Sequence, residues 1–277
     1  MKKNKIIIGI IGYGNMGKAI VERISPIFNV IIFDKDKVKS SNVSSIAIAD
    51  SAVNLIAVTD VVIIAVKPQD FGDVLGEIKN SIDSKLIISI AAGITTKYIE
   101  KVLGKVRVIR VMPNLPAKIG KGMSCLCKGK FAITADLKFA KKILNLLGET
   151  LILDESMMDK ATAVSGSGPG FLYSLISGKS LEEAKKCAKR DFLHSLVIVS
   201  SAIGFTPMQA RVLAKTTTLG SIEFLEKSGL LADDLLKQVA SKGGTTEAGL
   251  KELKGNIKFL PKAIKAAVKR AKELSRK

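Results

Sequence analysis

The chain has 277 residues, of which 47% are hydrophobic and 25% charged, enough apolar material for one or two folded domains and unlike a disordered chain. It carries 44 lysines and arginines against 25 acidic residues, a net charge of +19, so anionic partners have to be considered. A single histidine, His194, and three cysteines without CxxC spacing argue against a metal site, a Ser/His/Asp mechanism and a disulfide framework.

Short apolar runs rich in valine and isoleucine alternate with amphipathic segments along the first half of the chain. Nearly continuous apolar runs of this kind are typical of strands that are buried on both faces of a parallel sheet. The pattern therefore predicts a doubly wound, Rossmann-type α/β domain over residues 1–156. The expected strands are Ile6–Ile11, Val30–Phe33, Val61–Val66, Leu86–Ile90, Val106–Met112 and a weaker Leu151–Leu153.

Strand-like runs end after residue 156, and helical patterns replace them. These patterns predict an all-helical second domain over residues 157–277, in which His194 is a packed or hydrogen-bonded structural histidine. The expected helices are Met157–Ile176, a helix that begins at the capping box Ser180–Glu183 and continues to Val199, Pro207–Ser228, Leu230–Val239 and Ile257–Leu274.

A glycine motif, Gly12-x-Gly14-x-x-Gly17, follows the first expected strand and opens a helical segment. The first glycine permits a tight turn, the second lets a pyrophosphate approach the backbone, and the third lets helix and strand pack closely. Asp34 ends the second strand, where a carboxylate accepts hydrogen bonds from a ribose 2′-hydroxyl and repels a 2′-phosphate. The motif predicts a nicotinamide dinucleotide site that slightly favours NADH. The opposite preference would come from three nearby lysines, Lys35, Lys37 and Lys39.

Three later turns follow strands, at the edge where open α/β sheets bind ligands. We expect the turns Ala65–Gln69 and Ser89–Gly93 to line the cofactor cleft, although each also fits an ordinary strand-to-helix turn. In the third turn, Arg110–Met123, two prolines form a rigid segment. This segment either presents Asn114 to the cleft or is purely structural.

The loop Ser241-Lys-Gly-Gly-Thr-Thr246 joins two expected helices. Consecutive glycines and hydroxyls before a helix start provide backbone N–H groups that suit a carboxylate. The alternative is a capped helix start with Thr245 or Thr246 as the N-cap, and the loop taken by itself favours this alternative.

Lysines recur at helical spacing near the end of the chain. Such lysines could contact nucleic-acid phosphates. However, no aromatic residues lie between them on which bases could stack, so the pattern favours a solvent-exposed helix face over a nucleic-acid site. Because no apolar run is long enough to span a membrane and the cysteines suit a reducing compartment, we expect a cytoplasmic protein. The lysines are Lys258, Lys262, Lys265, Lys269 and Lys272.

These motifs, in this order, resemble the pyrroline-5-carboxylate reductase family, and Ser165–Pro169 combined with Gly243–Leu250 is the most specific pair. The resemblance implies a Rossmann domain and a helical dimerisation domain in a homodimer or higher homo-oligomer. It also implies that NADPH or NADH reduces the C=N bond of 1-pyrroline-5-carboxylate to L-proline. The matching segments are Gly12–Ala19, Ala65–Gln69, Ser89–Ile94, Arg110–Met123, Asp159–Pro169, Ala240–Leu250 and Arg270–Leu274.

The resemblance also assigns roles to single residues. Thr246 would lie beside the ring nitrogen as the catalytic residue, orienting an imine that is already electrophilic when protonated. The substrate carboxylate would meet Ser241, Gly243, Gly244 and Thr245. The residues expected at the cofactor, including Asp34 and Asn114, are Ile11, Gly12, Tyr13, Gly14, Asn15, Met16, Gly17, Asp34, Ala65, Val66, Lys67, Pro68, Ala91, Ala92, Gly93 and Asn114.

The chain departs from the family pattern in several places. Lys242 replaces a usual proline, Leu115 replaces a usual threonine, and an extra segment is expected around residues 177–191. Acidic residues expected near His194 and Ile198 are missing. Two alternatives therefore stay open: another Rossmann-plus-helical imine or hydroxyacid reductase, or a basic nucleic-acid-binding protein with an inactive Rossmann domain. A hydroxyacid reductase would be favoured by a catalytic lysine in the middle of the helix between the domains. In this chain that region, Thr162–Gly168, contains no lysine.

Overall fold

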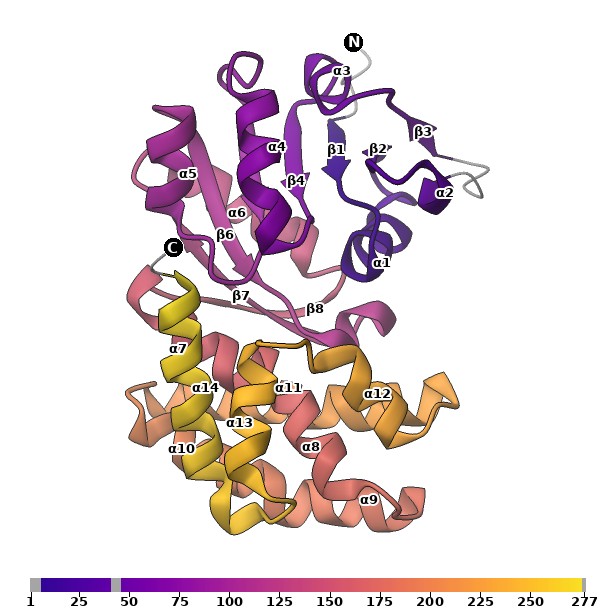
Figure 1. The fold of residues 1–277 in the computed structure, drawn as a ribbon, viewed down its shortest axis with the longest axis vertical. Helices are drawn as coiled ribbons and strands as arrows, with labels where there is room; N and C mark the ends of the chain where they lie inside the picture. The colour runs from indigo at the N-terminus through magenta and orange to yellow at the C-terminus, as the bar shows by residue number, and fades with distance from the viewer. Residues whose placement is uncertain (1–5, 41–45, 276–277) are drawn as a thin grey trace. The chain divides into compact units, whose positions relative to one another are not determined.

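The computed structural model describes residues 6–40 and 46–275 (Figure 1). The chain divides into two compact units. Unit 1 extends to Val111 and includes Leu126–Leu146, and unit 2 comprises Met112–Cys125 together with the chain from Leu147 onward. The chain therefore passes from one compact unit to the other at residues other than 156. The predicted domain boundary after residue 156 stays a prediction.

The strands of the described residues lie in the order β3-β2-β1-β4-β5-β6-β7-β8. Every pairing from β3 through β6 is parallel, and this order of strands is that of doubly wound dinucleotide-binding folds, which confirms the predicted fold class. The strands are β1 (Ile7–Ile11), β2 (Asn29–Phe33), β3 (Ala47–Ile48), β4 (Val61–Ile64), β5 (Leu86–Ser89), β6 (Arg107–Met112), β7 (Gly122–Lys128) and β8 (Gly148–Ile152).

Two of these strands, β3 and β7, were not predicted from the sequence. β3 has two exposed residues at the end of the sheet, so it leaves no hydrophobic pattern. β7 is buried over six of its seven residues but contains serine, methionine and two cysteines in place of a valine and isoleucine run. Its composition therefore hides a strand that its burial shows clearly.

The helices of unit 1 pack on a core of aliphatic residues from the parallel strands. Ile64, Ile87 and Val108, from three neighbouring strands, belong to this core, and Phe71 and Leu75 contribute to it from a helix. The core confirms strands that are buried on both faces. The helices are α1 (Asn15–Ile24), α2 (Lys37–Ser40), α3 (Ala52–Ala57), α4 (Phe71–Ile78), α5 (Thr96–Leu103) and α6 (Thr134–Leu144).

Helices dominate unit 2, as predicted, and α13 and α14 lie side by side within it (Figure 1). The lysine face expected near the end of the chain lies on the exposed side of α14, which buries Leu260 and Ile264 on its other side. No helix in the described ranges is long and apolar enough to cross a membrane. The helices are α7 (Met158–Ala161), α8 (Gly168–Ile176), α9 (Leu181–Cys187), α10 (Leu193–Ala202), α11 (Pro207–Ser228), α12 (Ala232–Val239), α13 (Thr245–Leu253) and α14 (Leu260–Ser275).

The predicted helix Met157–Ile176 is helical along nearly all of its length, but it is not one regular α-helix. A π-helical turn at Thr162–Gly166 separates α7 from α8, and the Ser167 N–H donates to the carbonyl of Thr162, five residues back, at 2.9 Å. Glycines weaken a helix and Pro169 has no N–H to donate, so this segment does not continue a regular α-helix. The turn sets where Ser167 lies.

A second π-helical turn, Ala188–Phe192, separates α9 from α10 within the other predicted long helix. His194 on α10 is exposed, so the alternative of a packed histidine is wrong, and that of a hydrogen-bonded structural histidine stays a prediction. Leu196 and Val199 form the buried face of α10, and His194, two residues before Leu196, lies on the opposite side of the helix. The expected extra segment 177–191 is largely helical, and its status as an insertion stays a prediction.

Candidate functional site

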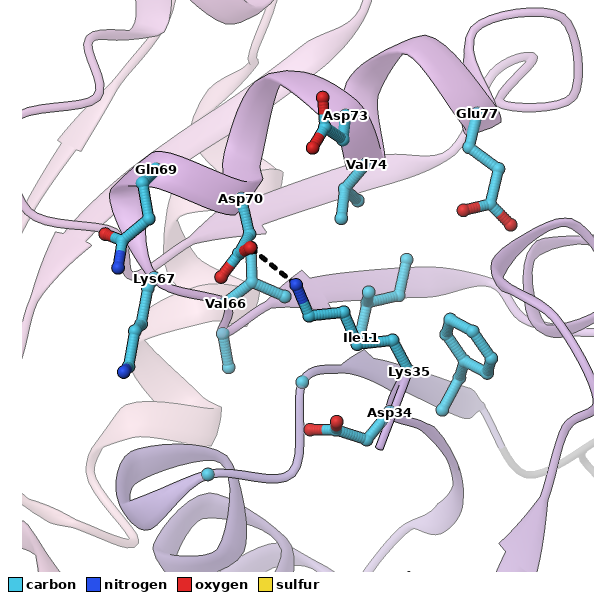
Figure 2. Close-up of a pocket in the computed structure, with 14 residues that line it drawn as sticks. Ile11, Asp34, Lys35, Val66, Lys67, Gln69, Asp70, Asp73, Val74 and Glu77 are labelled. Atoms are coloured by element: carbon cyan, nitrogen blue, oxygen red, sulfur yellow. Dashed lines mark hydrogen bonds and ion pairs between the residues drawn. The ribbon is translucent and has the colours of Figure 1, made fainter. Parts of the chain in front are cut away.

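A cavity of about 390 Å³ lies in unit 1 where β1, β2 and β4 end (Figure 2). The carboxyl ends of parallel strands on either side of the first strand form the usual ligand crevice of a doubly wound sheet. Predicted cofactor residues from three separate strand ends meet here. They are Ile11, Gly12, Gly14, Asp34, Ala65, Val66 and Lys67.

The glycine motif forms the floor of this cavity by allowing very close backbone approach. Gly12 has a φ of +102°, and a Cβ built on it would lie 2.8 Å from the carbonyl carbon of Ala65. A Cβ on Gly17 would overlap the carbonyl oxygen of Gly12. Gly14 differs, because nothing lies within 4 Å of its Cβ position. The loop therefore leaves open space in front of the first N–H groups of α1, as a dinucleotide pyrophosphate requires.

Asp34 joins the end of β2 to the glycine loop. Its carboxylate accepts hydrogen bonds from the backbone N–H of Tyr13 at 2.7 Å and of Asp36 at 2.9 Å. Burial raises the pKa of the Tyr13 phenol, and Glu22 adds to this effect. The Asp34 carboxylate is thus held at the cavity wall, as the ribose contact predicted for it requires.

An ion pair crosses the cavity between Lys35 and Asp70 (Figure 2). The Lys35 ammonium donates to an Asp70 carboxylate oxygen at 2.6 Å, and this hydrogen bond raises the pKa of Lys35. Asp73 and Glu77 follow on the same side of α4, so that wall is acidic. Sequence analysis missed these acids. Their spacing of three and four residues beside the apolar stripe of α4 was the available signal.

Other predicted cofactor residues are not among those that line this cavity. Ser89 at the end of β5 pairs with Ile64 of β4, so the turn that follows β5 starts at the same edge of the sheet. The cofactor contacts predicted for these residues stay predictions. The residues are Tyr13, Asn15, Met16, Gly17, Pro68, Ala91, Ala92 and Gly93.

Asn114 is in unit 2, where its side chain is buried in a hydrogen-bonded turn. Its amide oxygen accepts from the Met123 N–H at 2.8 Å, and its amide nitrogen donates to the Ser165 carbonyl at 3.2 Å. These bonds support the structural alternative for this turn, and the cofactor contact of Asn114 stays a prediction.

The predicted substrate loop, Ser241–Thr246, lies in unit 2 before α13. Gly243 has a φ of +70°, and its carbonyl accepts a hydrogen bond at 2.8 Å from the Arg270 Nε on α14. Glu247 accepts the N–H of Gly243 at 2.6 Å, and the Ser241 carbonyl accepts that of Gly244 at 3.0 Å. Two of the predicted anion donors, the N–H groups of Gly243 and Gly244, therefore already have acceptors, one in Glu247 of α13 and one in the loop. Thr245 and Thr246 occupy the first turn of α13, whose N–H groups have no intrahelical partners.

Neither threonine caps α13. The N-cap is Gly244, and no side chain makes a capping hydrogen bond, so the N-cap alternative for Thr245 and Thr246 is wrong. Their hydroxyls instead contact Ser167, which precedes α8. The Thr246 hydroxyl donates to the Ser167 Oγ at 3.1 Å, and the Ser167 Oγ lies 2.9 Å from the Thr245 Oγ1.

A doubly wound sheet with this glycine loop, together with a helical unit, defines an NAD(P)-dependent oxidoreductase of the Rossmann type. Residues 7–93 match the family described as NADP oxidoreductase, coenzyme F420-dependent. Residues 190–274 match the family described as pyrroline-5-carboxylate reductase dimerisation. The second match begins where the expected extra segment ends.

Several known proteins resemble this chain along its length. A pyrroline-5-carboxylate reductase of Methanosarcina acetivorans is 33% identical, with 98% of each chain covered. The solved structure of a pyrroline-5-carboxylate reductase from Coxiella burnetii covers 99% of this chain and 100% of its own, with a TM-score of 0.66 and 30% identity. The Plasmodium falciparum pyrroline carboxylate reductase, solved with NADP bound, has a TM-score of 0.64 and 28% identity over 99% of both chains.

The chain belongs to the pyrroline-5-carboxylate reductase family. This membership favours the family resemblance over the two alternatives, a different Rossmann-plus-helical reductase and a basic nucleic-acid-binding protein. The exposure of the α14 lysines agrees with a solvated helix face, and that interpretation stays a prediction.

We predict that Gly14→Val strongly weakens cofactor binding without unfolding the protein. Gly14 has a φ of −78°, which valine adopts easily, and its Cβ position is open. The added side chain would fill the space expected for the pyrophosphate. Each charge-assisted hydrogen bond lost costs roughly 1.5–3 kcal/mol, so NADH affinity falls at least about tenfold. Titration of NADH fluorescence measures this affinity, and thermal unfolding checks the fold.

The matched control for this prediction is Gly76→Val on α4. Its Cβ position is equally open, but Gly76 does not line the cavity. It should bind NADH as the unaltered protein does. A folded Gly14→Val protein with unchanged affinity would contradict the site.

We also predict that Asp70→Asn shifts cofactor preference toward NADPH. The substitution removes a negative charge and releases the Lys35 ammonium, which then attracts a 2′-phosphate. Exposed ion pairs are worth about 0–1 kcal/mol, so the ratio of the two dissociation constants should shift by up to about fivefold. Glu77→Gln is the control, because it removes the same charge from the same wall without releasing Lys35. Equal shifts in the two variants would show that Lys35 does not hold the phosphate.

Proposed function

We propose that the protein reduces the C=N bond of 1-pyrroline-5-carboxylate to L-proline with NADPH or NADH, the last step of proline biosynthesis. The similarity to pyrroline-5-carboxylate reductases over 98% of the chain carries this conclusion. The open glycine loop of unit 1 and the hydroxyl-rich loop of unit 2 support it. Oxidation of NAD(P)H by the purified protein, on addition of 1-pyrroline-5-carboxylate, tests it directly.

In this proposal unit 1 binds the cofactor. The first N–H groups of α1 bind the pyrophosphate and Asp34 accepts from a ribose hydroxyl. These residues fit the group because Gly14 leaves the loop open and the Tyr13 N–H fixes the Asp34 carboxylate. When bound, the nicotinamide supplies a hydride to the imine carbon.

Unit 2 binds the substrate. The carboxylate of the ring is placed at the first turn of α13, where backbone N–H groups and the helix dipole favour an anion. Thr246 contacts the ring nitrogen. A protonated imine needs no further activation, so orientation of the ring is the main contribution of these side chains.

We predict that Thr246→Val impairs the reaction and leaves cofactor affinity unchanged. Valine keeps the shape of the buried side chain and removes its hydroxyl. The loss of one hydrogen bond to a charged group costs about 1.5–3 kcal/mol, which is roughly a ten- to hundredfold fall in kcat/KM. Steady-state kinetics with 1-pyrroline-5-carboxylate measure it.

Thr218→Val on α11 is the matched control. Its buried hydroxyl has no hydrogen-bond partner within the described residues, so its removal should leave kcat/KM unchanged. Full activity of Thr246→Val would place the substrate nitrogen elsewhere.

We further propose a homodimer or larger homo-oligomer in the cytoplasm. The match of residues 190–274 to the dimerisation family supports the assembly, and the absence of a disulfide among the three cysteines, all of them described, supports the location. Light scattering at micromolar concentration should give at least twice the chain mass of 29.6 kDa. A stable monomer would contradict the assembly, and removal of residues 178–190 would then test whether the extra segment prevents it.

A further inference from the structure

Three hydroxyl groups meet in unit 2 where α8 and α13 begin. The Ser167 side chain is completely buried, and Thr246 is 4% exposed. The Ser167 Oγ lies 3.1 Å from the Thr246 Oγ1 and 2.9 Å from the Thr245 Oγ1. Ser167 therefore connects the two threonines, which belong to the predicted substrate loop.

The hydrogen bonds of this trio have a direction. The Thr246 hydroxyl donates its single proton to Ser167, so its oxygen offers only lone pairs to any other partner. Because the Ser167 hydroxyl is buried, its own proton also needs a hydrogen-bond acceptor, and the Thr245 oxygen is within reach. The distance to Thr245 allows either hydroxyl to donate. With Ser167 as the donor, the Thr245 proton is left for a further acceptor, and the trio is an acceptor at Thr246 and a donor at Thr245.

The substrate of the proposed reaction has the complementary polarity. The protonated imine nitrogen donates through its N–H, and the carboxylate, on the adjacent ring carbon, accepts. We propose that Ser167 is a positioning residue, which sets the hydroxyl of Thr246 as an acceptor for the imine N–H and that of Thr245 as a donor to the carboxylate. This inference rests on the proposed function and adds to it how the zwitterionic substrate is recognised.

The packing around Ser167 holds these distances. The π-helical turn before it directs its N–H to the Thr162 carbonyl, and a Cβ on Gly170 would lie 2.6 Å from the Thr246 methyl group. A Cβ on Gly249 would meet the ring of Phe171. The starts of α8 and α13 thus approach closely because glycines face the other helix, and the hydroxyls reach one another.

The first test uses Ser167→Ala in the full chain. Without its acceptor the Thr246 proton turns to the imine nitrogen and stabilises the unprotonated imine. The pKa of the bound imine then falls, so the alkaline limb of kcat against pH moves to lower pH. We expect kcat/KM to fall about tenfold at neutral pH, since one hydrogen bond to a charged group is weakened. The control is Ser200→Ala, which removes a buried hydroxyl that donates within α10 and should change neither quantity.

A binding measurement gives a readout apart from turnover. L-Proline carries a charged ring nitrogen, and cyclopentanecarboxylate has the same ring without it. Ser167→Ala should lose most of the preference for L-proline over cyclopentanecarboxylate, as should Thr246→Val. The double variant should be no worse than the poorer single variant, because both remove the same link. An unchanged preference, or losses that multiply, would overturn the proposal.

Thr245→Val tests the other end of the trio without altering Ser167, so it applies even where Ser167→Ala fails to fold. It should lower kcat/KM for 1-pyrroline-5-carboxylate about tenfold and leave 1-pyrroline, which has no carboxylate, unaffected. Equal losses on the two substrates would overturn the assigned polarity.

If the unaltered protein does not reduce 1-pyrroline-5-carboxylate, the proposed function fails. If it does and Ser167→Ala behaves like Ser200→Ala, the inference alone fails.

Discussion

The close approach of three backbone segments at Gly12 is the constraint on which unit 1 depends. The end of β1, the segment after β4 and the start of α1 come so near that a side chain at Gly12 or Gly17 would collide with backbone atoms. Because neither position carries a side chain, α1 can begin directly at the edge of the sheet. Its first N–H groups then face the cavity, and the adjacent Tyr13 N–H reaches Asp34. One steric condition thus places both the N–H groups predicted to bind phosphate and the carboxylate predicted to accept from the ribose.

Unit 2 uses the same device for a different purpose. Gly170 and Gly249 let α8 and α13 approach without bulky side chains between them, and the result is a set of buried hydroxyls instead of an open loop. Buried hydroxyls must be hydrogen-bonded, so close packing here also determines which way each proton points. The geometry of the proposed substrate site therefore follows from helix packing and involves no charged side chain among these buried hydroxyls.

Much of unit 1 could be predicted because aliphatic runs, turn glycines and Asp34 leave strong local patterns. The acids of α4 and the ion pair of Lys35 with Asp70 could not, since they depend on which helix covers the end of β2. In unit 2 the loop before α13 was recognisable from its glycines and threonines. Its contact with Ser167 lies 79 residues away along the chain and follows from a π-helical turn that no periodicity signals.

Glu247 gives the substrate loop an internal competitor. Its carboxylate binds the Gly243 N–H, where an external carboxylate would otherwise dock, and it is tethered to the same short segment. The chain thus supplies its own anion at the Gly243 end of the loop, while the N–H groups in the first turn of α13 keep no intrahelical partner. Two glycines that look equivalent to the neighbouring threonines in the sequence are therefore already occupied as donors, and only the helix start stays open to a ligand from outside.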